Sequence, residues 1–210
     1  MKYVSTRGRA PVLGFGDVLL AGLATDGGLY VPERWPELGV DDLTEWVDRP
    51  YQDIAVDVMA PFVEGDIERD ELAELVTRAY SSFDHPDVTP LRDLGDGLWL
   101  LELFHGPTLA FKDVALQLVG PLFERELERR GDRVTIIGAT SGDTGSAAIE
   151  STKDRDGIEI VMLHPHGRVS DIQRLQMTTV DSANVHNLAV EGTFDDCQDL
   201  VKAMFADESL

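Results

Sequence analysis

The stretch Val134-Thr-Ile-Ile-Gly-Ala-Thr-Ser-Gly-Asp-Thr-Gly145 decides the fold. Its first five residues, Val134–Gly138, are a short apolar run that predicts a buried strand. A helix is then predicted over Asp143–Ser151, and a second buried strand over Ile158–Leu163. Strands that alternate with helices across short connections are typical of a parallel α/β sheet. We therefore expect a parallel βαβ arrangement in this part of the chain.

The same alternation extends toward both ends of this region. Further elements are predicted as strands over Leu98–Phe104 and Val185–Val190, and as helices over Phe111–Arg130, Asp171–Thr179 and Phe194–Ala206. Gly131 is a natural stop for the longest of these helices. The expected fold class is therefore α/β, with a parallel βαβ sheet domain over residues 89–210.

Residues 1–88 are predicted to form a mainly helical N-terminal region. Between Asp41 and Glu74 there are 12 acidic residues and two basic ones, and apolar residues recur at helical spacing in both halves of this stretch. We interpret the two halves as amphipathic helices with a solvated acidic face. An acidic docking surface is the alternative interpretation.

The composition limits the class of protein. The chain has 210 residues, with 39 acidic and 18 basic side chains, so its net charge is −21. A protein that binds nucleic-acid phosphates needs a basic face, which this charge argues against. No apolar run reaches the roughly 18 residues of a membrane span, and the N-terminus lacks the apolar core of a signal peptide. The single cysteine, Cys197, fits a reducing compartment, so we expect a cytoplasmic protein.

The first segment that carries chemistry is Gly106-Pro-Thr-Leu-Ala-Phe-Lys-Asp113. Lys112 follows three apolar residues at the start of a predicted helix, where burial and the positive end of the helix dipole disfavour an ammonium ion. A neutral amine in such a place can form a Schiff base with an aldehyde. The other lysines are poorer candidates: Lys2 lies at an end expected to fray, Lys153 precedes three charged residues, and Lys202 fits the polar face of the last predicted helix. The alternative is an ordinary surface lysine whose ammonium group reaches solvent.

The second segment is Gly138-Ala-Thr-Ser-Gly-Asp-Thr-Gly145, which joins the buried strand to its helix. Its glycines let the backbone approach a ligand closely, and the first amide N–H groups of the helix point into the same space. No lysine follows the last glycine, so it is not a Walker loop, and the glycine spacing does not fit the dinucleotide fingerprint. The sequence predicts an anion site at a helix start, with a purely structural turn as the alternative.

Taken together, the two segments resemble the threonine synthase family, which consists of pyridoxal-phosphate enzymes of the fold-type-II, tryptophan-synthase-β-like group. Three further stretches carry the same resemblance: Tyr3–Gly8, Gly22–Pro32 and Gly192–Asp199. The resemblance therefore covers the chain nearly end to end. It implies a lyase with pyridoxal 5′-phosphate as cofactor, which converts the small molecule O-phospho-L-homoserine and water to L-threonine and phosphate by γ-elimination and β-addition.

The resemblance also implies roles for individual residues. Lys112 is implied to hold the cofactor covalently and, once freed, to act as the base at the substrate Cα. The substrate carboxylate is implied to bind at the loop of Thr140, Ser141, Gly142, Asp143 and Thr144. Phe111 and Asp143 are implied to contact the cofactor ring. Many fold-type-II relatives have Asn where this chain has Asp143, whereas threonine synthases of this kind commonly have Asp. The role of Asp143 stays open, because an ionised carboxylate without a partner would repel the substrate carboxylate and the ring hydroxyl.

Two parts of the family's site have no counterpart in this sequence. One is the glycine-rich loop that holds the cofactor phosphate, and the other is the residue that faces the pyridine nitrogen. Both belong to the C-terminal half of these considerably longer enzymes, and no second glycine-rich strand–helix loop follows Gly167. We therefore expect this chain to be an N-terminal portion that binds the cofactor weakly and turns over little by itself.

Three other interpretations stay open. The nearest is another fold-type-II enzyme, such as a dehydratase, a cysteine synthase or a phospho-lyase. The second is an α/β module that binds an anion without catalysis. The third is a metal site at His164-Pro-His166, but two histidines fall short of the three or four ligands of such a site, so no metal is expected.

A few single residues complete the list of candidates. Ser5, Thr6 and Arg7 are candidates for binding the substrate phosphate. His105 directly precedes the lysine segment and is kept as a further site candidate. Cys197 is flanked by carboxylates that raise the pKa of a thiol, so it is not proposed as a nucleophile.

Overall fold

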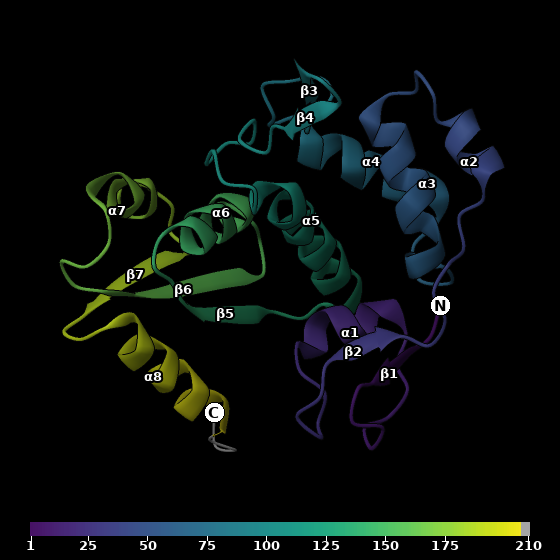
Figure 1. Cartoon of the computed structure of the whole chain (residues 1–210). Coiled ribbons are helices and arrows are strands. Elements are labelled where there is room, and N and C mark those ends of the chain that lie inside the picture. Colours follow the sequence, from purple (N-terminus) through teal and green to yellow (C-terminus); the bar gives the residue numbers. More distant parts are fainter. Residues whose placement is uncertain (207–210) are drawn as a thin grey trace. The chain divides into compact units, whose positions relative to one another are not determined.

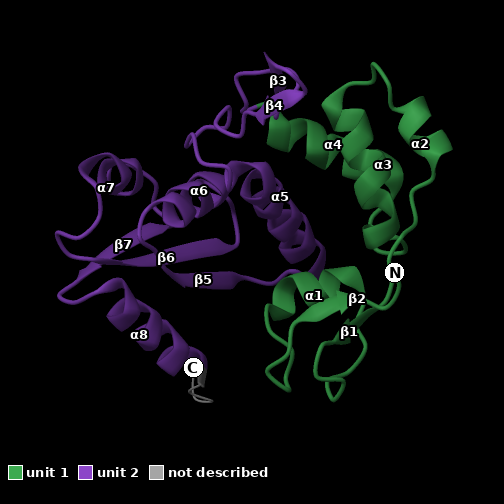
Figure 2. Cartoon of the chain, viewed as in Figure 1, with its two compact units in different colours: residues 1–81 green, residues 82–210 purple. Residues whose placement is uncertain are grey.

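The computed structural model describes residues 1–206 and divides the chain into two compact units (Figure 2). The first unit is Met1–Ser81, and the second begins at Ser82. Each unit has its own helices and strands and is described separately. The domain boundary predicted after residue 88 stays a prediction, because a compact unit is not by itself a domain.

The first unit combines a small antiparallel sheet with helices (Figure 1). Its elements are β1 (Tyr3–Ser5), α1 (Phe15–Ala21), β2 (Tyr30–Pro32), α2 (Val40–Glu45), α3 (Tyr51–Val63) and α4 (Arg69–Tyr80). α3 and α4 are the two amphipathic helices expected from the acidic stretch. The predicted apolar stripe of α4 is buried and consists of Leu72, Leu75, Val76 and Ala79.

The N-terminus is held in a strand. β1 and β2 pair antiparallel, with Tyr3 opposite Pro32. The carbonyl oxygen of Lys2 also accepts a hydrogen bond from the N–H of Glu33 at 2.8 Å. The prediction that Lys2 lies at a frayed end is therefore wrong. The pairing could not be read from the first residues because the partner strand lies far along the chain.

Asp26 organises the turn between α1 and β2. Its carboxylate accepts hydrogen bonds from the hydroxyl of Ser5 at 2.7 Å and from the N–H of Gly28 at 3.0 Å. The N–H groups of Arg9 and Ala10 donate to its other oxygen at 2.9 and 3.1 Å. These donors lower the pKa of Asp26 to about 2, and the Ser5 hydroxyl is the largest cause. The carboxylate thereby joins segments on both sides of α1.

We expect the first unit to lose stability in acid through Asp26. A carboxyl group whose pKa is lower in the folded state stabilises the fold above its unfolded value of 3.8, and this contribution is lost as the pH falls toward about 2. The midpoint of thermal unfolding, measured from about pH 5 to about pH 2, should therefore fall more steeply in the wild type than in Asp26→Asn. Equal slopes in the two proteins would count against this role.

The second unit contains a hairpin followed by alternating helices and strands. Its elements are β3 (Leu91–Gly95), β4 (Leu98–Leu101), α5 (Asp113–Arg130), β5 (Val134–Ala139), α6 (Asp143–Thr152), β6 (Ile158–Pro165), α7 (Asp171–Thr178), β7 (Val185–Val190) and α8 (Phe194–Ala206). The bounds of β7 and α8 are those predicted from the sequence. α5 begins at Asp113, two residues after the predicted start at Phe111.

The sheet of the second unit runs in the order β5-β6-β7, and its strands are parallel. α6 and α7 lie on one side of this sheet, and α8 lies on the other (Figure 1). Ile149, Ile160, Met162 and Met177 form a buried cluster between the sheet and the first two of these helices. The predicted α/β class with a parallel βαβ sheet is confirmed.

The apolar run Leu98–Phe104 forms less structure than predicted. Only Leu98–Leu101 is a strand, and it pairs antiparallel with β3 outside the parallel sheet. Every residue of β4 is exposed. An apolar run of this length is therefore compatible with an exposed hairpin as well as with a buried strand, and periodicity does not separate the two.

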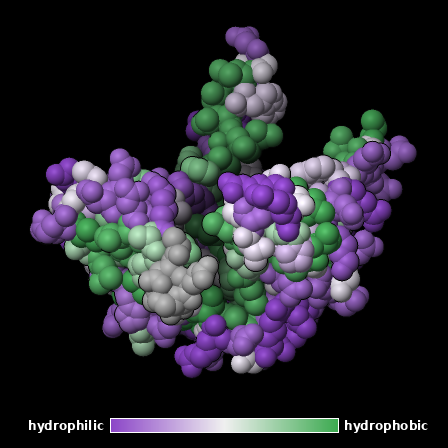
Figure 3. Space-filling model, turned by 90° about the horizontal axis from the view of Figure 1, so that it is seen from below, coloured by the Kyte–Doolittle hydropathy of each residue, from purple (hydrophilic) through white to green (hydrophobic). Residues whose placement is uncertain are grey.

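Large apolar side chains are exposed in both units. On the hairpin they include Leu91, Leu94 and Trp99, and in the first unit Trp35 and Val40. Figure 3 shows hydrophobic residues, in green, among hydrophilic ones on the face viewed from below. Among residues 1–206, no helix is both long enough and apolar enough to cross a membrane.

Cys197 is buried in α8 and is expected to react slowly. Burial is the main cause that raises the pKa of its thiol, and the charge of Asp196 is the second. A disulfide reagent such as dithionitrobenzoate should modify the native protein at least roughly 100-fold more slowly than the protein unfolded in guanidinium. A native rate close to that of a free thiol would show that Cys197 is accessible.

Candidate active site

Lys112 caps the N-terminus of α5, with φ −63° and ψ −23°. Its carbonyl oxygen accepts a hydrogen bond from the N–H of Leu116 at 2.9 Å, which begins the helix. The side chain is 26% exposed, and Nζ lies 4.3 Å from the centroid of the Phe111 ring. The amine therefore stands at the positive end of α5, as predicted, with an aromatic face beside it.

The apolar residues that precede Lys112 lie at the surface. Leu109 is 65% exposed and Phe111 is 60% exposed. Neither side chain is itself buried, although the Phe111 ring covers one side of the amine. Leu109 has a φ of 62°, and its backbone turns so that the side chain faces solvent.

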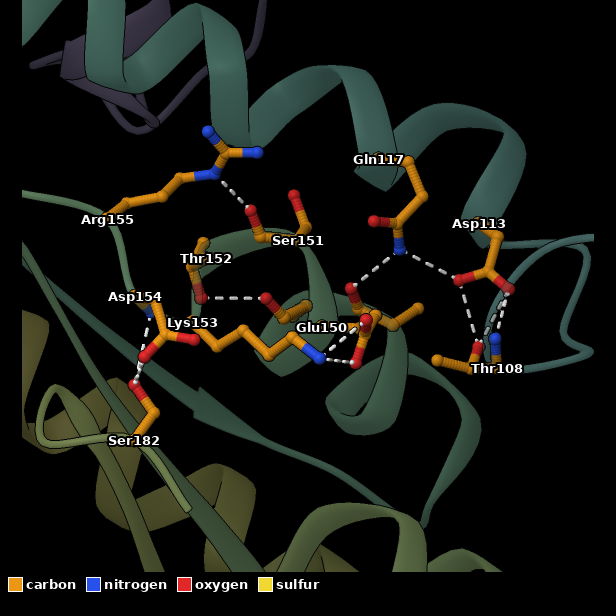
Figure 4. A network of polar contacts seen from close by, with 12 residues as sticks. Thr108, Asp113, Gln117, Glu150, Ser151, Thr152, Lys153, Asp154, Arg155 and Ser182 are labelled. Atoms are coloured by element: carbon orange, nitrogen blue, oxygen red, sulfur yellow. Dashed lines mark hydrogen bonds and ion pairs between the residues drawn. The ribbon is translucent and has the colours of Figure 1, made fainter. Parts of the chain in front are cut away.

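Asp113 holds the lysine segment from the inside. Its fully buried carboxylate accepts hydrogen bonds from the N–H of Thr108 at 2.8 Å and from the Thr108 hydroxyl at 2.9 Å. Nε2 of Gln117 donates to the same carboxylate at 3.0 Å and to the carbonyl of Ala147 in α6 at 3.3 Å (Figure 4). Gly106 packs so closely that a Cβ there would collide with Asp113. Buried hydrogen bonds thus hold the lysine segment to α5 and α6.

Thr140 shapes the loop between β5 and α6. Its buried hydroxyl accepts hydrogen bonds from the N–H groups of Gly142 at 3.0 Å and Gly145 at 2.9 Å. Gly142 has a φ of 144°, which side chains rarely allow, and a Cβ on Gly145 would lie 2.5 Å from the methyl group of Thr140. The Thr140 hydroxyl is therefore engaged within the loop, and its role toward a substrate stays a prediction.

The outer surface of this loop carries Ser141, Asp143 and Thr144, which are exposed. In the described part of the chain, the backbone N–H groups of these three residues have no hydrogen-bond acceptor. They lie at the start of α6, where the helix dipole adds positive potential. Free N–H groups at a helix start bind anions, so the predicted anion site has a suitable geometry.

The structure brings the lysine segment and the loop together. Oδ2 of Asp143 lies 3.9 Å from Nζ of Lys112. The other carboxylate oxygen of Asp143 accepts a hydrogen bond from Nε2 of Gln173 in α7. Nε2 of Gln176, three residues further along α7, donates to the carbonyl of Thr108 at 2.9 Å. Neither glutamine was a site candidate from the sequence, because glutamine is common on helices and no local pattern marks these two.

The candidates for binding a substrate phosphate lie in the first unit and are engaged within it. The hydroxyl of Ser5 donates to Asp26, and Nη1 of Arg7 donates to the Asp26 carbonyl at 2.9 Å. The hydroxyl oxygen of Thr6 accepts a hydrogen bond from the N–H of Leu29 at 3.0 Å. Their role in phosphate binding stays a prediction.

His105 lies between two carboxylates just before the lysine segment. Its Nε2 is 2.9 Å from Oε2 of Glu102, and its Nδ1 is 2.7 Å from Oδ1 of Asp84. These two hydrogen bonds raise the pKa of His105, and the bond with Glu102 is the larger cause. The imidazole thus joins the residue after β4 to the chain before β3, next to the site.

The two histidines of the His-Pro-His stretch are placed differently. His164 is buried near the end of β6, whereas His166 is exposed and lies 2.9 Å from a carboxylate oxygen of Glu191. Among the described residues, no group of three or more His, Cys, Asp and Glu side chains could hold a metal ion.

The residues around Lys112 fit a cofactor that carries an aldehyde. The partly exposed amine can attach it, Phe111 offers a ring face, and the free N–H groups of the loop can take an anionic group close by. On a parallel α/β sheet, these features define the class of enzymes that bind a carbonyl cofactor through a lysine.

Comparison with known proteins identifies the family. Residues 83–210 match the family described as "Pyridoxal-phosphate dependent enzyme", and residues 2–80 match "Threonine synthase N terminus". The chain belongs to the pyridoxal-phosphate-dependent enzyme family. The resemblance and the cofactor family expected from the sequence are confirmed.

The relatives are similar along the whole of this chain. Threonine synthase from Pseudomonas aeruginosa is 56% identical over 208 residues, which cover 99% of this chain and 44% of that protein. Threonine synthase from Schizosaccharomyces pombe is 49% identical over 216 residues, which cover 99% and 42%. The crystal structure of pyridoxal-phosphate-bound threonine synthase from Brucella melitensis has a TM-score of 0.94 and 52% identity, and the match covers 100% of this chain and 45% of that one. The chain thus spans less than half the length of these relatives.

Proposed function

We propose that the protein acts as a threonine synthase, converting O-phospho-L-homoserine and water to L-threonine and phosphate. One observation carries the proposal: the amine of Lys112 lies 3.9 Å from Asp143, so the lysine segment and the anion-binding loop form one site. The similarity to threonine synthases along the whole chain supports the same reaction. The net charge of −21 fits a protein whose partner is a small molecule and not a nucleic acid.

Lys112 serves this reaction first as the attachment point for the cofactor and then as a base. Pyridoxal phosphate, when bound, supplies an electron sink for negative charge at the substrate Cα. The amine of Lys112 takes the proton from Cα and then moves protons at Cβ and Cα. Phosphate leaves from Cγ, and water adds at Cβ. A lysine on a fixed helix start can serve each of these steps because its side chain rotates about a fixed backbone.

The loop after β5 binds the substrate carboxylate. The N–H groups of Ser141, Asp143 and Thr144 supply donors, and the start of α6 supplies positive potential. The carboxylate of Asp143 would repel a substrate carboxylate if it had no partners. The hydrogen bond from Gln173, and Lys112 whenever it carries a proton, offset this repulsion and allow the two carboxylates to lie near each other.

A product assay on the intact protein tests the proposed function. With pyridoxal phosphate and O-phospho-L-homoserine, we expect phosphate and L-threonine to form in equal amounts. Phosphate with 2-oxobutanoate and ammonia in place of threonine would identify a phospho-lyase. Release of neither product from a protein that binds the cofactor would favour the anion-binding module. A cytoplasmic location belongs to this proposal, since the thiol of Cys197 is free.

A further inference from the structure

We propose that Gln173 of α7 is a positioning residue that holds the carboxylate of Asp143 toward the amine of Lys112. The inference rests on the proposed function only in taking Lys112 as the reactive amine. It concerns a residue outside both chemical segments of the sequence. It also gives Asp143 a defined role, which is to balance the charge of the amine from a fixed position.

The two oxygens of Asp143 are divided between two partners. Nε2 of Gln173 donates a hydrogen bond to Oδ1, and Oδ2 lies 3.9 Å from Nζ of Lys112. A carboxylate held at one oxygen by a neutral donor presents its other oxygen in a fixed direction. Gln173 therefore determines where the negative charge next to the amine lies.

Ser170 determines which end of the Gln173 amide faces Asp143. The hydroxyl oxygen of Ser170 accepts a hydrogen bond from the N–H of Gln173 at 3.3 Å, as the cap of α7. Its hydrogen is then free to donate to Oε1 of Gln173 at 2.8 Å. With the amide oxygen occupied, the NH2 end faces the carboxylate, which can only accept. The three side chains thus form an ordered series of donors and acceptors.

The loop provides the space that this contact needs. A Cβ at Gly142 would lie 2.5 Å from Cδ and 2.6 Å from Oε1 of Gln173. The glycine therefore lets α7 approach the loop closely enough for the amide to reach Asp143. The same side of α7 holds Gln176, whose Nε2 donates to the carbonyl of Thr108 at 2.9 Å. One helix thus contacts both the loop and the lysine segment.

Exposure explains why such a tether matters. The side chain of Asp143 is 50% exposed, and that of Lys112 is 26% exposed. Ion pairs between exposed side chains are weak because water screens them and because both side chains lose rotamer freedom. The Asp143 carboxylate is already held by Gln173, so it loses less rotamer freedom when it pairs with Lys112. The tether therefore strengthens the effect of Asp143 on the amine.

Chemical labelling of the cofactor-free protein tests the inference. The chain has four lysines, so mass spectrometry can follow acetylation of Lys112 by acetic anhydride, with Lys2, Lys153 and Lys202 as internal references. Near pH 8, Asp143→Asn should speed the labelling of Lys112 roughly two- to five-fold, because the ammonium form loses its counter-charge. Gln173→Met should give a smaller increase, because Asp143 remains but is no longer held.

The double variant separates a positioning role from a structural one. In the Asp143→Asn background, Gln173→Met should have no further effect on the labelling of Lys112, since there is no carboxylate left to hold. Ile172→Ala, at an exposed neighbour on α7, is the matched control and should leave the rate unchanged. Ser170→Gly keeps a residue suited to the helix cap while freeing the Gln173 amide, and should act in the same direction as Gln173→Met.

Clear results would overturn the inference. If Lys112 is acetylated in Gln173→Met or in Asp143→Asn at the same rate as in the wild type, the contact does not act on the amine. An equal effect of Gln173→Met with and without Asp143 would show that Gln173 acts through the fold. Labelling is measured without cofactor or substrate, so its outcome is independent of whether the protein forms threonine.

Discussion

In the intact protein, Lys112→Ala is expected to remove covalent cofactor binding and to lower the rate of threonine formation by at least roughly 10³-fold. The reason is that the variant loses both the attachment point for pyridoxal phosphate and the base that acts at Cα. The absorption band of the lysine-bound cofactor should be absent from the variant, while its thermal unfolding midpoint stays close to that of the wild type. The partial exposure of the side chain is consistent with a small structural cost.

Lys153→Ala is the matched control for this variant. Lys153 lies in the same unit, and its ammonium contacts Glu150 at 2.7 Å, so it tests the loss of a paired lysine away from the site. Its absorption band and its rate should equal those of the wild type. A Lys112→Ala protein that keeps the band, or that keeps most of its activity, would show that another amine carries the cofactor.

Asp113→Ala is expected to lower the free energy of unfolding by roughly 2–4 kcal/mol. The buried carboxylate accepts hydrogen bonds from Thr108 and Gln117. Its removal takes the acceptor from both donors of Thr108 and leaves Gln117 only the carbonyl of Ala147. Urea unfolding followed by circular dichroism measures the change. The free energy of unfolding of Asp113→Asn should lie between those of the wild type and Asp113→Ala. The reason is that one of the two carboxylate oxygens is replaced by an NH2 group that faces donors.

Asp132→Ala provides the control for Asp113. Asp132 is exposed after α5, so its loss should change the free energy of unfolding by no more than about 0.5 kcal/mol. If Asp113→Ala unfolded at the same urea concentration as Asp132→Ala, the hydrogen bonds drawn in Figure 4 would contribute little to stability. The lysine segment would then have to be held mainly by other contacts.

The second half of the fold was largely predictable because its signals are local. Val185–Val190 and Phe194–Ala206 have the predicted bounds, since a short apolar run and a helical stripe each identify one element. The pairing of β1 with β2 was not predictable, because neither three-residue strand has a pattern of its own. The run Leu98–Leu101 has a clear apolar pattern, but this pattern wrongly predicted a buried strand because its residues do not face a core.

The residues of the site likewise include some that the sequence predicts and some that it does not. Lys112 and the loop at residues 140–144 could be found because their residue types and spacing carry chemistry. The contact of Asp143 with Gln173 joins residues 30 positions apart, and that of Gln176 with Thr108 joins residues 68 positions apart. Glutamine is common on helices, so nothing in the local pattern marks these two side chains. Only the packing of α7 against the loop gives them a role.

The buried carboxylate next to Lys112 has one more consequence. Neighbouring residues at a helix start point in different directions, so fixing Asp113 inward also fixes the direction in which the backbone presents Lys112. The protein has therefore already lost the backbone entropy of this segment when it folds. Ligand binding then has less disorder to remove, and the affinity for a cofactor depends more on the contacts it makes. In thermodynamic terms the lysine segment is preorganised, and the folding free energy of the second unit has already met the cost of ordering it.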